Sequence, residues 1–116
     1  MKKILSILLF TMLFTLTSKA QIVVTHFNAS WNEPNKAKWV GELEECEITY
    51  VDITTSPKLQ QRYKVVVLPT IIIFKDGYEV QRFQADLSFK MMFTKEEIQE
   101  AIDKYIPNLK ITQFGL

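Results

Sequence analysis

The most constraining feature of the sequence is the apolar run from Val65 to Phe74, which only Pro69 and Thr70 interrupt. A strand that is apolar at consecutive positions is typical of the inside of a sheet covered on both faces. Proline cannot donate a hydrogen bond within a sheet, so Pro69 by itself argues against a strand at its own position. Asp76-Gly77 follows the run after Lys75 and predicts a hairpin turn into a second strand at Tyr78–Phe83.

The rest of the chain from Gln21 alternates between strand and helix patterns, which is typical of an α/β fold. Strands are predicted over Ile22–Phe27 and Ile48–Ile53. A helix between them is predicted to begin around Pro34, since proline is tolerated in a first helical turn. Its inward residues would be Ala37, Val40 and Leu43.

Two further helices are predicted downstream. Ser56 followed by Pro57 is typical of a helix start. Thr94 and Glu97 have the spacing of a capping box, and an apolar stripe follows at helical spacing, formed by Ile98, Ala101, Ile102 and Tyr105.

The first twenty residues predict a signal peptide. Lys2 and Lys3 precede the apolar stretch Ile4–Leu16, and Ser18-Lys19-Ala20 offers small residues at a cleavage site. The alternative is a retained membrane anchor, although this stretch is short for a bilayer core of about 30 Å. We therefore expect an exported protein, periplasmic or secreted, with a signal peptide at 1–20, a domain at 21–106 and a tail at 107–116.

Removal of residues 1–20 would take away Lys2, Lys3 and Lys19 and leave eleven basic against thirteen acidic residues. This balance predicts neither a nucleic-acid partner nor an association with membrane after cleavage. Cys46 is the single cysteine, so no intrachain disulfide can form. We expect Cys46 to be a buried apolar residue, with an intermolecular disulfide as the alternative.

Two motifs carry a resemblance to a known family. The strand ending at Phe27 leads into Trp31-Asn32-Glu33-Pro34-Asn35-Lys36, and Leu68-Pro69-Thr70 precedes the long apolar strand. Together they resemble the thioredoxin-like family, in which the tryptophan is followed by Cys-Gly-Pro-Cys-Lys and the later proline is cis. In this sequence Asn32 and Asn35 occupy the positions of the two redox cysteines.

The resemblance implies an α/β thioredoxin-like fold with the minimal order β-α-β-α-β-β-α, lacking the family's leading strand and helix. The strand Ile48–Ile53 would then lie at a sheet edge, where self-association is possible. An asparagine amide cannot act as a thiolate, so dithiol exchange at Asn32 and Asn35 is excluded.

In the family, the groove beside the cis-proline holds extended peptides. The same surface in this sequence predicts binding of a peptide or partner protein by Trp31, Asn32, Glu33, Asn35, Leu68 and Pro69. The alternative is structural: Asn32 would cap the helix and Trp31 would cover the core.

Other candidate residues are interpreted more simply. His26 falls where many thioredoxins carry a buried acid, and we expect a hydrogen-bonded interior histidine. With one histidine in the chain, no metal site and no cofactor is predicted. Phe89, Met91 and Met92 indicate loop packing or an adaptable partner surface. Asn28-Ala29-Ser30 matches a glycosylation triplet, which is weak support for a modification.

Two further functions remain open from the sequence. One is a thiol-disulfide oxidoreductase or isomerase that works through Cys46 as a single thiol. The other is a structural assembly subunit that associates through the edge strand Ile48–Ile53.

Overall fold

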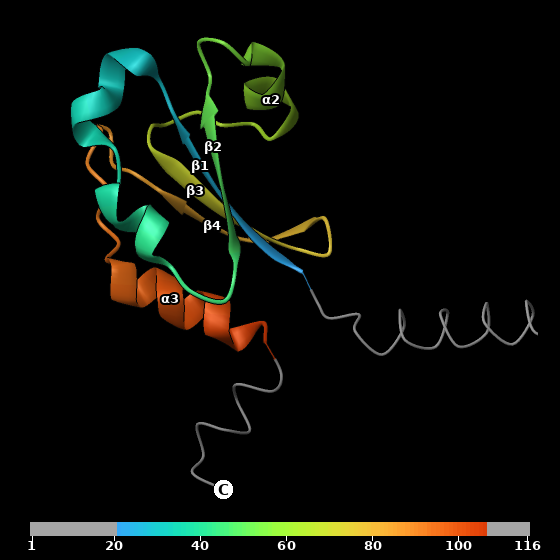
Figure 1. The fold of residues 1–116 in the computed structure, drawn as a ribbon. Coiled ribbons are helices and arrows are strands. Elements are labelled where there is room, and N and C mark those ends of the chain that lie inside the picture. Colours follow the sequence, from blue (N-terminus) through green and yellow to red (C-terminus); the bar gives the residue numbers. More distant parts are fainter. Residues whose placement is uncertain (1–20, 107–116) are drawn as a thin grey trace, which may run out of the picture.

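A computed structural model of the protein describes residues 21–106 and shows one mixed four-stranded sheet (Figure 1). The strand order is β2-β1-β3-β4, with β1 parallel to β2 and antiparallel to β3, and β3 antiparallel to β4. The strands are β1 (Ile22–Asn28), β2 (Glu47–Asp52), β3 (Thr70–Lys75) and β4 (Tyr78–Gln84). This architecture confirms the predicted α/β class; the predicted signal peptide and tail lie outside the described residues.

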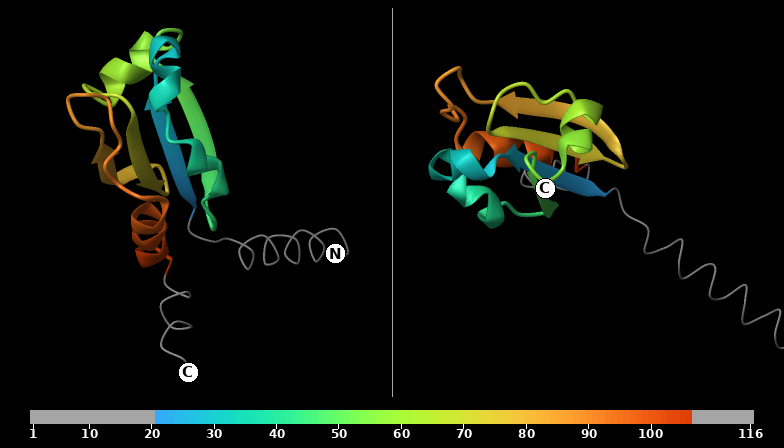
Figure 2. Two further views of the ribbon diagram at one scale, coloured as in Figure 1. Left: turned by 90° about the vertical axis from the view of Figure 1, so that its left-hand side faces the viewer. Right: turned by 90° about the horizontal axis from the view of Figure 1, so that it is seen from above.

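Strand β3 is buried on both faces, as its continuous apolar run predicts. Ile71 and Ile73 belong to one core, and Ile72 belongs to a second core on the opposite face. Helix α3 (Lys95–Lys104) covers the first face, and α2 (Pro57–Arg62) lies on the second (Figure 2). The strand itself is shorter than the apolar run, because it begins at Thr70, directly after the cis peptide bond between Leu68 and Pro69.

The predicted α-helix after Trp31 is wrong. This segment instead forms two short 3-10 helices, η1 (Ser30–Asn35) and η2 (Lys38–Glu42). Extended backbone at Lys36 and Ala37 separates them. The buried residues explain the difference, since Ala37, Val40 and Leu43 recur at intervals of three. Three residues make one turn of a 3-10 helix, whereas each such step in an α-helix rotates the side chain away by about 60°.

The local signals elsewhere predict the observed structure. Asp76 and Gly77 have φ values of 51° and 88°, as the hairpin between β3 and β4 requires. The Thr94 hydroxyl accepts a hydrogen bond of 3.1 Å from the Glu97 N–H at the start of α3. Ser56 precedes α2 as expected, but its side chain makes no capping hydrogen bond.

Truncation of a core residue of α3 should test the packing. Ile98 is fully buried in the first core, whereas Leu87 is 91% exposed. We expect Ile98→Ala to lower the free energy of unfolding by about 2–5 kcal/mol in denaturant titrations, through lost burial and a residual cavity. Leu87→Ala should change it by less than about 0.5 kcal/mol. Equal effects would show that α3 does not pack on the sheet in this way.

Candidate functional site

The two residues at the cysteine positions are joined by a hydrogen bond. The Asn35 Nδ2 group donates to Asn32 Oδ1 at 2.8 Å, and Asn32 Nδ2 donates to Asn28 Oδ1 at 2.9 Å. Asn28 Nδ2 in turn donates to the Asn32 main-chain carbonyl at 3.1 Å. We call Asn28, Asn32 and Asn35 the asparagine network. It links the end of β1 to η1 through amide groups alone.

The network places Asn32 inside the protein. Its side chain is 3% exposed and makes hydrogen bonds through both its donor and its acceptor. The proposed direct contact of Asn32 with a peptide is therefore not available in this conformation. Nor does Asn32 cap a helix, because the N-cap of η1 is Ala29.

Sequence reasoning missed Asn28 as a member of the site. Asn28 is 7% exposed, and its Nδ2 atom donates a hydrogen bond to the main-chain carbonyl of Asn32. An amide in this position is not open to glycosylation in the folded state, because that modification requires a surface site. One signal in the sequence could have identified Asn28: it is a polar residue at the end of a mostly apolar strand, four positions before Asn32.

The remaining predicted binding residues divide into an exposed and a buried group. Trp31 is 62% exposed and contacts Phe89 edge-to-face, with 5.5 Å between the ring centroids. Glu33 and Asn35 are exposed, whereas Leu68 is 5% exposed and Pro69 is fully buried. Within residues 21–106, the main-chain N–H and carbonyl of Leu68 form no hydrogen bond. This surface therefore offers an aromatic pair and unused backbone groups.

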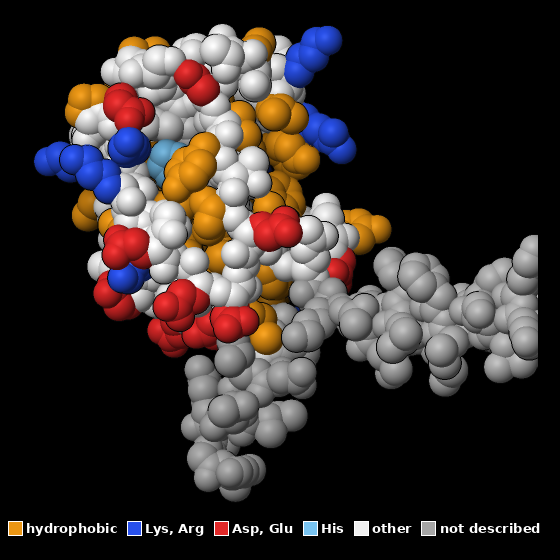
Figure 3. Space-filling model, in the orientation of Figure 1, with side chains coloured by type: hydrophobic (Ala, Val, Ile, Leu, Met, Phe, Trp, Pro, Cys, Tyr) orange, Lys and Arg blue, Asp and Glu red, His pale blue; other side chains and the backbone are white. Residues whose placement is uncertain are grey.

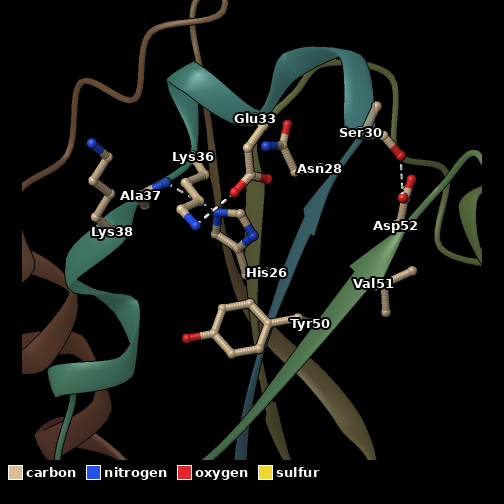
Figure 4. Close-up of a pocket in the computed structure, with 11 residues that line it drawn as sticks. His26, Asn28, Ser30, Glu33, Lys36, Ala37, Lys38, Tyr50, Val51 and Asp52 are labelled. Atoms are coloured by element: carbon tan, nitrogen blue, oxygen red, sulfur yellow. Dashed lines mark hydrogen bonds and ion pairs between the residues drawn. The ribbon is translucent and has the colours of Figure 1, made fainter.

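A pocket of about 240 Å³ lies between η1, the break before η2 and strand β2 (Figure 4). His26 forms part of its wall, and its Nε2 atom accepts a hydrogen bond of 3.1 Å from the Ala37 N–H. Burial lowers the pKa of His26, so the ring is neutral near pH 7 and carries its proton on Nδ1. The prediction of a hydrogen-bonded interior histidine is confirmed.

Charged side chains surround the entrance of this pocket, and most are already paired. Lys36 Nζ lies 2.6 Å from Glu33 Oε1, and this hydrogen bond raises the pKa of Lys36. The Asp52 carboxylate accepts hydrogen bonds from the Ser30 and Thr54 hydroxyls, which lower its pKa to about 2. The Ser30–Asp52 contact ties the start of η1 to the end of β2.

Cys46 packs against the first core but is only half-buried, so it is less buried than predicted. Burial, followed by the nearby charges of Asp103 and Glu45, raises the pKa of its thiol to about 11. A thiol with this pKa is protonated at neutral pH and is a poor nucleophile. Between Gln21 and Ile106, no three His, Cys, Asp or Glu side chains gather as a metal site requires, and no helix is suited to span a membrane.

Removing the middle of the asparagine network should cost stability. Asn32→Ala leaves the buried Asn28 amide without its side-chain partner, and we expect a loss of about 1–3 kcal/mol in the free energy of unfolding. Asn35→Ala removes one hydrogen bond of the network, but its donor is exposed and water can replace it, so the loss should be smaller than for Asn32→Ala. Denaturant titration measures both. An Asn32→Ala variant as stable as Asn35→Ala would contradict the network.

The buried histidine predicts a pH dependence. Below a pH of about 6.5 the unfolded chain takes up a proton on its histidine before the folded chain does. The free energy of unfolding should therefore fall as the pH decreases from about 7.5 to about 5.5. His26 is the one histidine of the sequence, so His26→Gln, whose Oε1 atom can accept from Ala37, should remove this slope. Identical slopes in the two proteins would contradict the assignment.

Sequence comparison finds thioredoxins among the relatives of this chain. The thioredoxin of Chlamydia trachomatis serovar D is 39% identical over 67 residues, which cover 53% of this chain and 66% of that protein. The thioredoxin of Staphylococcus aureus strain Mu50 is 29% identical over 92 residues, covering 73% of this chain and 83% of the relative. The chain thus spans just under two thirds of the Chlamydia protein, and 31% of the chloroplastic thioredoxin Y1 of Arabidopsis thaliana.

Solved structures show the same fold. Fasciola hepatica thioredoxin superimposes with a TM-score of 0.56 at 26% identity, over 75% of this chain and 83% of that one. Schistosoma mansoni thioredoxin gives a TM-score of 0.60 at 20% identity, over 80% and 84% of the two chains. The family model for thioredoxin matches residues 13–104, which is most of the sequence. The chain therefore belongs to the thioredoxin family.

Proposed function

We propose that this protein is an exported, redox-inactive thioredoxin-family module that binds an extended segment of a partner protein. Two observations carry the proposal: the main chain of Leu68, which forms no hydrogen bond within residues 21–106, and the exposed Trp31–Phe89 pair. An extended peptide can add hydrogen bonds to free backbone groups while its side chains contact a neighbouring aromatic surface. Export is the part of the proposal that rests on the pattern of residues 1–20.

The chemistry of the site argues against redox turnover. Amide side chains at positions 32 and 35 cannot attack a disulfide, and here they hydrogen-bond to each other. The alternative single-thiol mechanism through Cys46 would need a reactive thiolate. A pKa of about 11 leaves roughly one thiol in ten thousand ionised at neutral pH, which disfavours that alternative.

The loop after β4 supplies the apolar part of the proposed surface. It presents exposed side chains from Leu87, Phe89, Met92 and Phe93. The loop has a defined shape, because Asp86 Oδ1 accepts hydrogen bonds of 2.9 and 3.0 Å from the Ser88 and Lys90 main-chain N–H groups. Phe89 sits at a φ of 67°, and its ring is directed against Trp31. The partner segment should therefore carry an apolar residue that meets this pair.

The proposal predicts that binding depends on Trp31. Peptides selected from a random library on the wild-type protein should bind Trp31→Ala at least about tenfold more weakly, because a large aromatic anchor is lost. Tyr78→Ala is the matched control, since Tyr78 is 77% exposed on the hairpin at the start of β4. Affinities are measured by titration calorimetry on proteins of equal stability.

A second variant separates the aromatic pair from general effects on the fold. Phe89→Asn preserves compatibility with a positive φ and removes the ring, so it should weaken the same peptides. Binding that is unchanged in both Trp31→Ala and Phe89→Asn would refute the proposed surface. Catalytic reduction of a disulfide substrate by the wild-type protein would refute the absence of redox turnover.

A further inference from the structure

Among residues 21–106, strand β2 forms an open edge of the sheet, and it lacks the features that usually prevent edge pairing. Its sequence, Glu47–Asp52, contains no proline and no lysine, and its pairing with β1 is regular. The other edge strand, β4, is interrupted by a register shift opposite Ile73 and Phe74. Bulges and edge lysines are common means of blocking association, so β2 is the more available edge.

The direction of the free backbone groups on β2 follows from one hydrogen bond. The Ile53 N–H donates to the Asn28 carbonyl on β1 at 2.9 Å. Since successive residues of a strand direct their backbone groups to opposite sides, Glu47, Thr49 and Val51 face β1. Ile48, Tyr50 and Asp52 therefore face outward. The Asp52 carbonyl is already occupied by the Thr55 and Ser56 N–H groups at 3.1 and 2.9 Å.

We propose that two copies of this chain pair through β2 in an antiparallel arrangement, with the two-fold axis at Thr49. In this register Ile48 of each copy lies opposite Tyr50 of the other. Both residues direct an N–H and a carbonyl outward, so each of the two pairs can exchange two hydrogen bonds. The result is one continuous sheet across the dimer.

The side chains of β2 suit a second copy in this register. Tyr50 is 61% exposed and would meet the half-buried Ile48, an aromatic and β-branched pair of the kind that stabilises adjacent strands. Thr49 would lie opposite its own copy, and Glu47 opposite Val51. Figure 3 shows hydrophobic side chains along the face where β2 is nearest the viewer.

The backbone directions exclude one alternative register. A register with Glu47 opposite Asp52 would place like charges against each other at both ends. That register requires residues of opposite backbone direction to pair, so the hydrogen bonds to β1 already exclude it. The acidic ends of β2 therefore do not oppose each other in the register centred at Thr49.

Single cysteines test the register directly. In the full chain carrying Cys46→Ala, one cysteine is introduced at a time by Glu47→Cys, Ile48→Cys, Thr49→Cys, Tyr50→Cys or Val51→Cys. Opposite residues in a non-hydrogen-bonded pair have Cα atoms about 4.5 Å apart, which suits a disulfide. We expect mild oxidation to give a covalent dimer with Thr49→Cys and little with the other four. Equal crosslinking at all positions, or none at Thr49, would overturn the proposal.

Sedimentation measures the same association without a crosslink. The wild-type chain should pass from monomer to dimer as its concentration rises, and Tyr50→Lys should shift this transition to at least about tenfold higher concentration. Tyr78→Lys makes the same substitution on β4 and should leave the transition unchanged. A wild-type chain that stays monomeric up to about 1 mM, or equal behaviour of the two lysine variants, would overturn the proposal.

Discussion

The hydrogen bond between Asn35 and Asn32 is the contact on which the functional interpretation of this protein depends. It joins the two positions that carry sulfur in an active thioredoxin, and Asn28 extends it into the end of β1. A link of this kind does not respond to reductants or oxidants, since amides do not exchange sulfur bonds. We therefore expect the turn to keep one shape in reducing and oxidising surroundings, in agreement with the proposed binding function.

The backbone around Asn32 and Asn35 is consistent with the presence of amides in place of thiols. A reactive thiolate benefits from the positive end of an α-helix, whose aligned peptide dipoles lower its pKa. Here the segment after Trp31 forms two short 3-10 helices, and the break between them turns the Ala37 N–H toward His26. Loss of both thiols is thus accompanied by loss of the continuous helix that would activate them. In the described part of the chain, the proposed interactions rest on the exposed Trp31–Phe89 pair and on the edge strand β2.

Local patterns predicted much of the fold, because their causes lie within a few residues. The apolar run of β3, the Asp76-Gly77 turn and the Thr94 cap each depend on neighbours in sequence. The 3-10 geometry depends instead on which side chains meet the sheet, and the pattern of Ala37, Val40 and Leu43 fits more than one helix type. The burial of Asn32 could not be predicted from the sequence either. Its partner Asn28 lies at the end of strand β1, and only the three-dimensional structure shows that this strand end meets Asn32.

Hydrogen exchange of the asparagine side-chain amides, followed by NMR, tests the central claim most directly. The Nδ2 protons of Asn28 and Asn32 are donated within the protein, so they should exchange much more slowly than those of a solvent-exposed amide. Addition of a reductant should leave their exchange rates unchanged. Exchange of the Asn32 amide at the rate of a free side chain would contradict the account, because the hydrogen bond to Asn28 that holds Asn32 in the asparagine network would then be absent in solution.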